Sequence, residues 1–294
     1  MAGAGVFTME KYERGDDLTH IAYMELCKNV CVRDLTFCDS SNWNMVLWSC
    51  ENAEINNLKI IGHRGNSDGI DVCSSKNVHV KNCFTRVWDD SFVVKSLGFG
   101  NSENIVFEDS TLWNDFARPI EVGVELRCES VRNVYFKNID IINSPTGYPV
   151  LGIHHGDRAE VSDIHFEDIR IERAPGAQIF DMRITDSVWN HDDTKGSIHD
   201  IYLKDITVVT QEGSCLSKSR IVGFSKESDI KNVFIDNLCI CGTYARNKEE
   251  AGLIIDDYVK NVYFTAKEPY LDVINTELNI FEDFVLDNNM YKGK

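Results

Sequence analysis

Three aspartates stand before apolar runs in the stretch "NSDGIDVCSSKNVHVKNCFTRVWDDS", residues 66–91. Asp68 precedes one apolar run, and the adjacent pair Asp89 and Asp90 precedes the next. Carboxyl groups brought together raise one another's proton affinity, so one stays protonated near neutral pH while the others are ionised. Hydrolysis of a glycosidic bond needs such an acid together with a base. Aspartate before a strand is also ordinary turn chemistry, so the trio alone leaves both interpretations open.

A short pattern that returns along the chain predicts how these acids meet. Its full copies are "KNVCVRDLTF", "ENAEINNLKI", "KNVHVKNCFT", "ENIVFEDSTL", "RNVYFKNIDI", "SDIHFEDIRI", "HDIYLKDITV" and "KNVFIDNLCI", followed by a partial "KNVYFTA". Each copy opens on a polar residue followed by Asn or Asp, and a second Asn or Asp comes five residues later, from Asp34 to Asn237. The alternating residues between them predict a strand with one buried face. Asn and Asp at both ends fit turns, where they tolerate left-handed conformations.

A second series of apolar runs lies between these copies: "NMVLWSC", "GIDVCSS", "SFVVKSL", "IEVGVEL", "VLGIHHG", "QIFDMRI", "SRIVGFS" and "AGLIIDD". Each repeat therefore supplies at least two strands, and it is too short for a strand followed by a crossover helix. Leucine-rich repeats and propellers are excluded by their different patterns. The sequence predicts an all-β fold, a single-stranded right-handed parallel β-helix of about nine coils.

The predicted coils bring distant residues together at one turn. Stacked coils lie about 4.8 Å apart, so equivalent positions form columns on the surface. Asp68 precedes "GIDVCSS", Asp89 and Asp90 precede "SFVVKSL", and Arg118 precedes "IEVGVEL". These positions open strands of the same series, so we expect them side by side over three coils.

Composition narrows the possible partners. A net charge of -17 disfavours binding to nucleic acid and to anionic membrane surfaces, and the sequence has no apolar run long enough for a membrane span. The ten cysteines form no CxxC pair and are expected to be reduced thiols in the core. The sequence has neither HExxH nor an EF-hand loop, so we expect no metal and no cofactor.

The stretch "NSDGIDVCSSKNVHVKNC" with "WDDSFVVKS" resembles the polygalacturonases, glycoside hydrolase family 28 of the pectin-lyase-like β-helix clan. That family has an Asn-x-Asp-Gly turn and then an Asp-Asp pair about one coil later, and the similarity extends roughly over residues 20–175. The resemblance implies an inverting glycoside hydrolase acting on an oligo- or polysaccharide. Asp89 would protonate the leaving oxygen while Asp68 and Asp90 hold the attacking water. The carboxyl groups of an inverting pair are expected about 6.5 to 9.5 Å apart.

Two segments depart from the family. Its Gly-His-Gly turn is here "ARP", residues 117–119, and its Arg-Ile-Lys strand is replaced by "LGIHHG", residues 151–156. In the family these elements help recognise a uronic carboxylate, so the sugar is left open, although Arg118 and Lys95 offer positive charge. The stretch "NDFARPIEVGVELR" resembles the equivalent turn of family 49, the dextranases and isopullulanases that act on neutral glucans.

Several residues near the acids are expected to bind the sugar. They are Arg118, Lys95, Glu121, His155, Trp88, Trp113 and Arg183. Trp43 is a further candidate, since sugar faces stack on aromatic rings, although such rings also serve for packing. His154 and His155 are adjacent on a strand, so at most one of them reaches the cleft. Arg183 shares a strand face with Asp181, and the two alternatively form a surface ion pair.

The ends of the chain and one long repeat carry further expectations. Residues 1–20 are expected to be a short N-terminal cap or extension, and residues 21–294 the catalytic β-helix. Residues 189–197, "WNHDDTKGS", predict a loop over one edge. An exposed end of the helix is covered either by the cap or by a second subunit, which makes a homo-oligomer an open possibility. The N-terminus lacks a secretory signal, which predicts a cytoplasmic protein, or a secreted one if the N-terminus is truncated.

Two other functions remain open at this point. One is a catalytically inactive β-helix that binds sugar or serves assembly, which the departures from the family favour. The other is a β-helix lyase, epimerase or fructan transferase. Lyases usually use a Lys or Arg base, often with calcium, and the acid trio does not match that chemistry.

Overall fold

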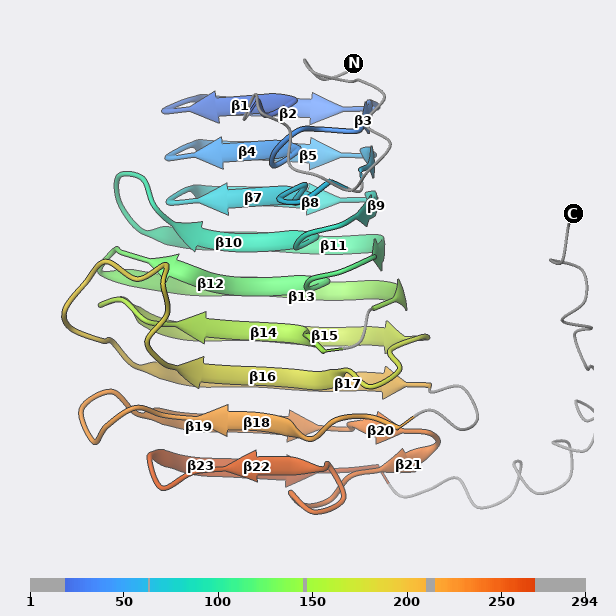
Figure 1. The fold of residues 1–294 in the computed structure, drawn as a ribbon, viewed down its shortest axis with the longest axis vertical. Coiled ribbons are helices and arrows are strands. Elements are labelled where there is room, and N and C mark those ends of the chain that lie inside the picture. Colours follow the sequence, from blue (N-terminus) through green and yellow to red (C-terminus); the bar gives the residue numbers. More distant parts are fainter. Residues whose placement is uncertain (1–18, 63, 145–146, 210–214, 268–294) are drawn as a thin grey trace, which may run out of the picture.

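Nine parallel strands stack in one sheet, and each comes from a different turn of the chain (Figure 1). They are β1 (Ala22–Glu25), β4 (Met45–Trp48), β7 (Ile70–Cys73), β10 (Phe92–Ser96), β12 (Ile120–Leu126), β14 (Pro149–His155), β16 (Gln178–Ile184), β18 (Ser219–Val222) and β22 (Leu253–Ile255). This computed structural model describes residues 19–62, 64–144, 147–209 and 215–267. Eight of the strands are the predicted second series of apolar runs, and β1 adds a coil before them.

The repeat copies form the opposite sheet. Its main path is β2 (Lys28–Arg33), β5 (Glu51–Asn56), β8 (Lys76–Lys81), β11 (Ser102–Asn114), β13 (Ser130–Asn143), β15 (Glu160–Ile171), β17 (Ile198–Val208), β19 (Ile230–Asp236) and β23 (Val259–Thr265). The first coils add the short strands β3 (Thr36–Cys38), β6 (Lys59–Ile61) and β9 (Phe84–Val87), and the last coils add β20 (Cys239–Ile240) and β21 (Thr243–Tyr244). The chain is therefore a right-handed parallel β-helix, and its nine stacked strands confirm the predicted number of coils.

Two columns of Asn and Asp turn the chain between its strands. All nine leading positions have φ between 55° and 58°, and the eight positions five residues later have φ between 51° and 57°. The side chains of the leading column also bond from coil to coil: the Asn104 amide donates to Asn77 at 2.8 Å, and Asn77 donates to Asn52 at 2.9 Å. The predicted left-handed turns are confirmed.

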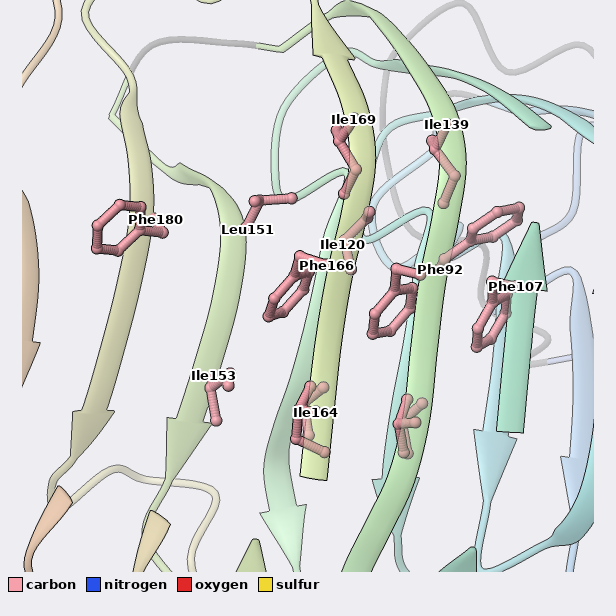
Figure 2. Packing of buried hydrophobic residues seen from close by; sticks show 14 of the residues in the cluster. Phe92, Phe107, Ile120, Ile139, Leu151, Ile153, Ile164, Phe166, Ile169 and Phe180 are labelled. Atoms are coloured by element: carbon pink, nitrogen blue, oxygen red, sulfur yellow. The ribbon is translucent and has the colours of Figure 1, made fainter. Parts of the chain in front are cut away.

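The interior is filled by apolar residues in register between coils. Phe92, Phe107, Phe136 and Phe166 are fully buried, with neighbouring ring centroids 4.7, 5.1 and 5.4 Å apart. Figure 2 shows Phe92, Phe107 and Phe166 pointing into the interior. The 5.1 and 5.4 Å spacings are close to the separation of hydrogen-bonded strands, so Phe107, Phe136 and Phe166 stack from coil to coil, whereas Phe92 packs on Phe107 across the interior of one coil. This packing supports the nine-stranded sheet from its inner face.

Parts of two expectations lie outside the described residues. Of the expected cap at residues 1–20, only residues 19 and 20 are described, and the catalytic domain expected to end at residue 294 is described as far as residue 267. Within the described part, no helix has the length and apolarity needed to cross a bilayer.

Candidate active site

The outer face of the nine-stranded sheet carries a cleft with a volume of about 610 Å³. Residues that alternate with the core side chains point to this face. One outward column links Asp71, Val93, Glu121, Gly152 and Asp181, each paired in register with the next. Charged side chains therefore recur on every second coil of this column, at Asp71, Glu121 and Asp181.

The three predicted acids meet in this cleft. Asp68 lies at the turn before β7, and Asp89 and Asp90 lie at the turn before β10, one coil later. One oxygen from each carboxylate lies within 4.8 Å of the others. Asp68 and Asp90 are buried, whereas Asp89 is half-buried and the most accessible of the three. The 4.8 Å joins single oxygen atoms, whereas the expected 6.5 to 9.5 Å is a separation of whole carboxyl groups.

Burial changes the proton affinity of two of these acids. Removal from water raises the pKa of Asp68 well above its usual value, the negative charge of Asp71 adds to the effect, and Lys95 opposes it. Burial also raises the pKa of Asp90 to about 7, against the opposing charge of Arg118. The cluster therefore holds protons near neutral pH, so both a protonated and an ionised carboxyl are available.

Lys95 links Asp68 of the acid trio to two further carboxylates. Its Nζ lies 3.5 Å from Asp68, 3.4 Å from Asp71 and 3.9 Å from Glu125. The same ammonium group sits 3.8 Å above the ring centroid of Trp43. Lys95, which was expected to bind sugar, lines the cleft while it makes these contacts. Its partners Asp71 and Glu125 were not among the predicted site residues.

Arg118 holds Asp90 from the next coil. Its backbone N–H donates to Asp90 Oδ1 at 2.9 Å, and its guanidinium Nη1 lies 3.5 Å from the same oxygen. Arg118 Nε lies 3.2 Å from Glu121 Oε2, and the guanidinium packs on the ring of Tyr148. Arg118 thus lines the cleft while fixing the position of one acid.

Glu121 is fully buried behind the cleft wall and continues the charged line. Its Oε1 lies 2.8 Å from His154 Nδ1, and His154 Nε2 lies 3.6 Å from Asp181. Asp181 in turn contacts Arg183 Nε at 2.9 Å. Burial alone would lower the pKa of His154, but Glu121 and Asp181 raise it on balance. A Cβ atom at Gly152 would lie 1.9 Å from Glu121 Oε2, so glycine makes room for this carboxylate.

His155, which was expected to bind the sugar, does not line the cleft. It shares the inward parity of Leu151 and Ile153 on β14, so it is only 1% exposed and burial lowers its pKa to about 4. His154 lines the cleft in its place. The alternation of the strand decides between the two histidines, and that signal is present in the sequence.

The two expected tryptophans also lie outside the cleft lining. The ring of Trp88 stacks on Phe116, with centroids 4.9 Å apart and planes 1° apart. Trp113 is on β11 of the other sheet, where Arg86 covers its ring at 4.8 Å. Trp43 does line the cleft, and so do Arg183 and Trp189. Trp189 belongs to the predicted loop at residues 189–197, but nothing in the sequence showed which way its ring faces.

Comparisons with known proteins show which family this chain resembles. A family model described as glycosyl hydrolases family 28 matches residues 7–252. An exopolygalacturonase of Oenothera organensis is 31% identical over 144 residues, which are 48% of this chain and 39% of that protein. A polygalacturonase of Gossypium barbadense is 26% identical over 227 residues, which are 70% of this chain and 54% of that protein.

A solved structure shares the architecture. The hyperthermoactive exopolygalacturonase from Thermotoga maritima matches with a TM-score of 0.60 at 18% identity, over 84% of this chain and 55% of that chain. This chain thus spans about half or less of the length of these three proteins. The shared fold and the family model, which matches most of the sequence, confirm the resemblance to the polygalacturonases. The chain belongs to family 28 of the glycosyl hydrolases.

Proposed function

We propose that this protein is an inverting glycoside hydrolase that cleaves O-glycosidic bonds in a pectin-type oligo- or polysaccharide. The observation that carries this proposal is the meeting of Asp68, Asp89 and Asp90 within 4.8 Å of one another in a cleft. The names of the relatives support a galacturonate-containing substrate, and the cations Arg118 and Arg183 in the cleft lining are compatible with an acidic sugar.

Asp89 is the general acid in this mechanism. It is the most accessible of the three carboxyls, so it can reach a glycosidic oxygen of a bound chain. Its proton passes to that oxygen as the bond from the anomeric carbon breaks. The departing sugar leaves with a hydroxyl group, and Asp89 is left ionised.

Asp68 and Asp90 share the role of base. Both are buried, and Asp68 Oδ1 has no hydrogen-bond partner among the described residues, so this buried oxygen keeps an unfilled acceptor position that the proposed water would occupy. The water attacks the anomeric carbon and gives up its proton to this pair, which restores the proton count of the site. The rule that relates carboxyl separation to stereochemistry is stated for a pair of carboxyl groups, whereas three carboxyl groups share the acid and base roles here. The direct test is therefore to identify the anomer of the product by NMR. A product that retains its anomeric configuration would contradict the mechanism.

Lys95 disfavours the lyase and epimerase alternatives. Burial opposes its charge, but Asp71, Asp68 and Glu125 raise its pKa well above the usual value. A lysine held protonated in this way cannot abstract a proton from a sugar. Lys95 is thereby ruled out as the base of such a reaction, and the proposed chemistry rests on the acid trio.

Replacement of Asp89 by Asn tests the proposal. The wild type and Asp89→Asn are assayed on galacturonate oligomers and on neutral galactose and glucose oligomers. We expect kcat to fall by about 10²- to 10⁴-fold on the substrate that the wild type cleaves, because proton donation is lost. Asp257→Asn, an exposed acid outside the cleft, is the matched control and should keep full activity. Unchanged hydrolysis by Asp89→Asn, or no hydrolysis by the wild type, would refute the function.

A further inference from the structure

The segment 185–197 between β16 and β17 forms one wall of the cleft. Thr185, Asp186, Ser187 and Trp189 line the cavity together with the acids. Figure 1 shows this yellow loop extending beyond the end of β16 and past β14 toward β12. The Trp189 carbonyl accepts a hydrogen bond from Arg127 Nη2 at 3.2 Å, and Arg127 directly follows β12. The wall therefore spans three coils.

Buried contacts hold this wall in one shape. The carboxylate of Asp157, fully buried, accepts from the backbone N–H groups of His191 at 2.7 Å and Asp192 at 3.0 Å. Its second oxygen accepts from Leu126 N at 3.0 Å, so the loop is tied to the strand series. Lys195 forms an ion pair with Asp186 at 2.5 Å. Because these contacts lie within and beneath the loop, the side chains that it presents to the cleft are preorganised.

Trp189 is the large apolar side chain that this wall leaves in the cleft. It is 57% exposed, although its backbone is fixed on both sides by Arg127 and by a bond from its N–H to Ser187 Oγ at 3.0 Å. Its neighbour Val188 is even more exposed but does not line the cleft. An indole ring kept in contact with water in a rigid wall is suited to bind a ligand with an apolar face.

We propose that Trp189 is the platform of a sugar-binding subsite, an inference that rests on the proposed hydrolase function. The C–H face of a pyranose ring packs on the indole face. The acids lie at turns that precede β7 and β10, whereas Trp189 lies in a loop that follows β16, so the two sites are at different ends of these strands. The platform therefore holds a sugar other than the two joined by the cleaved bond, and it selects for longer chains.

A series of chain lengths tests this subsite. Galacturonate oligomers from the dimer upward are titrated calorimetrically into Asp89→Asn, with and without Trp189→Ala. We expect Trp189→Ala to weaken the binding of the longer oligomers about tenfold and to leave the shortest ones unchanged. Trp189→Phe should recover most of the loss, and Val188→Ala, the matched control in the same loop, should bind as the parent does.

The outcomes separate the subsite from the proposed function. Equal weakening at every length, no weakening, or no binding of any oligomer would overturn the subsite. If Asp89→Asn abolishes hydrolysis but Trp189→Ala has no length-dependent effect, the function stands and the subsite falls. If Asp89→Asn hydrolyses as the wild type does while Trp189→Ala weakens only the long oligomers, the subsite stands and the assigned chemistry falls. A loosened loop, made by Asp157→Asn, should reproduce the Trp189→Ala pattern in a milder form.

Discussion

Lys95 places a positive charge inside a group of acids that burial would otherwise neutralise. Desolvation raises the pKa of Asp68 and of Asp71, the latter to about 7, and in both carboxyls the charge of Lys95 opposes the rise. A base must be ionised to take the proton of the attacking water. Lys95 therefore acts as a positioning residue that keeps part of the cluster ionised at neutral pH.

Lys95→Met should shift the pH profile of hydrolysis. Without the ammonium group the pKa of Asp68 rises further, so we expect the acid limb of kcat/KM to move to higher pH and the rate at neutral pH to fall. Loss of one partner of a buried ion pair also costs about 3 to 5 kcal/mol of stability, so the profile is measured at a temperature where the variant is folded. Lys95→Arg should restore the limb. A profile that keeps its shape in Lys95→Met would contradict this role.

The sequence predicted that the three acids meet, but it did not predict the wall of the cleft. Asp68, Asp89 and Asp90 open consecutive strands, so the spacing of the coils alone brings them together. The position of Asp71 on the outer face of its strand could also have been predicted, because Asp71 alternates with core residues in "GIDVC". The position of Trp189 could not be predicted in this way. The direction of a loop side chain depends on contacts such as the hydrogen bond from Arg127, which is 62 residues away in sequence, to the Trp189 carbonyl.

At the scale of the elements, the turns are the most regular feature of the chain. The leading Asn and Asp residues all adopt positive φ, a conformation that costs most residues with a Cβ roughly 1 to 2 kcal/mol. Asn and Asp tolerate it, and the Asn amides also bond to their neighbours in the stack. The repeat could thus be predicted from residue type, because the same backbone requirement recurs in every coil.

Asn104→Ala should destabilise the stack by about 2 to 3 kcal/mol. The substitution leaves a residue with φ of 57° without its favourable side chain, and it removes the amide bonds to Asn77 and from Asn133. Asn104→Gly loses the same bonds but relieves the backbone, so its loss should be smaller. Urea unfolding measures both variants. A glycine variant that is less stable than the alanine variant would show that left-handed strain is not the cause.

The length of the strands was harder to predict than their existence. In β11, β13, β15 and β17 the repeat copy and the segment after it merge into one long strand, whereas the coils before and after break into separate strands such as β8 and β9 or β19 and β20. The repeat copies in the long strands and those in the short strands have similar sequences. Their continuity depends on pairing with the neighbouring coil, which a single repeat does not reveal.

At the scale of the whole molecule, an acidic chain encloses a line of buried charges. The net charge of -17 makes the surface repel itself, and it grows less negative as the pH falls. The buried acids of the cleft respond in the same direction, because their pKa values are raised on folding. Salt separates the two contributions, since it screens exposed charges far more than buried ones.

Stability should therefore increase as the pH is lowered from about 8 to 6.5. Folding raises the pKa of Asp71 and of Asp90 from 3.8 to about 7, so in this window the native state binds protons that the unfolded chain has released. The free energy of unfolding then falls as the pH rises, by about 1 to 3 kcal/mol across the window. The raised pKa of His154 acts in the same sense. His155, with its pKa lowered to about 4, opposes the trend weakly as the pH approaches 6.5, where half of its unfolded form is charged, and more strongly at lower pH.

Thermal unfolding at high salt measures this dependence while surface repulsion is screened. Asp90→Asn removes one of the titrating carboxyls yet keeps an oxygen that can accept from the Arg118 N–H, so its pH dependence should be shallower than that of the wild type. Asp257→Asn, exposed and remote from the cleft, should leave the slope as it is. A wild type whose Tm rises between pH 6.5 and about 8 in high salt would mean that these carboxyls are ionised without cost in the folded protein. The buried carboxyls of the cleft would then not hold protons near neutral pH, as the proposed acid and base chemistry requires.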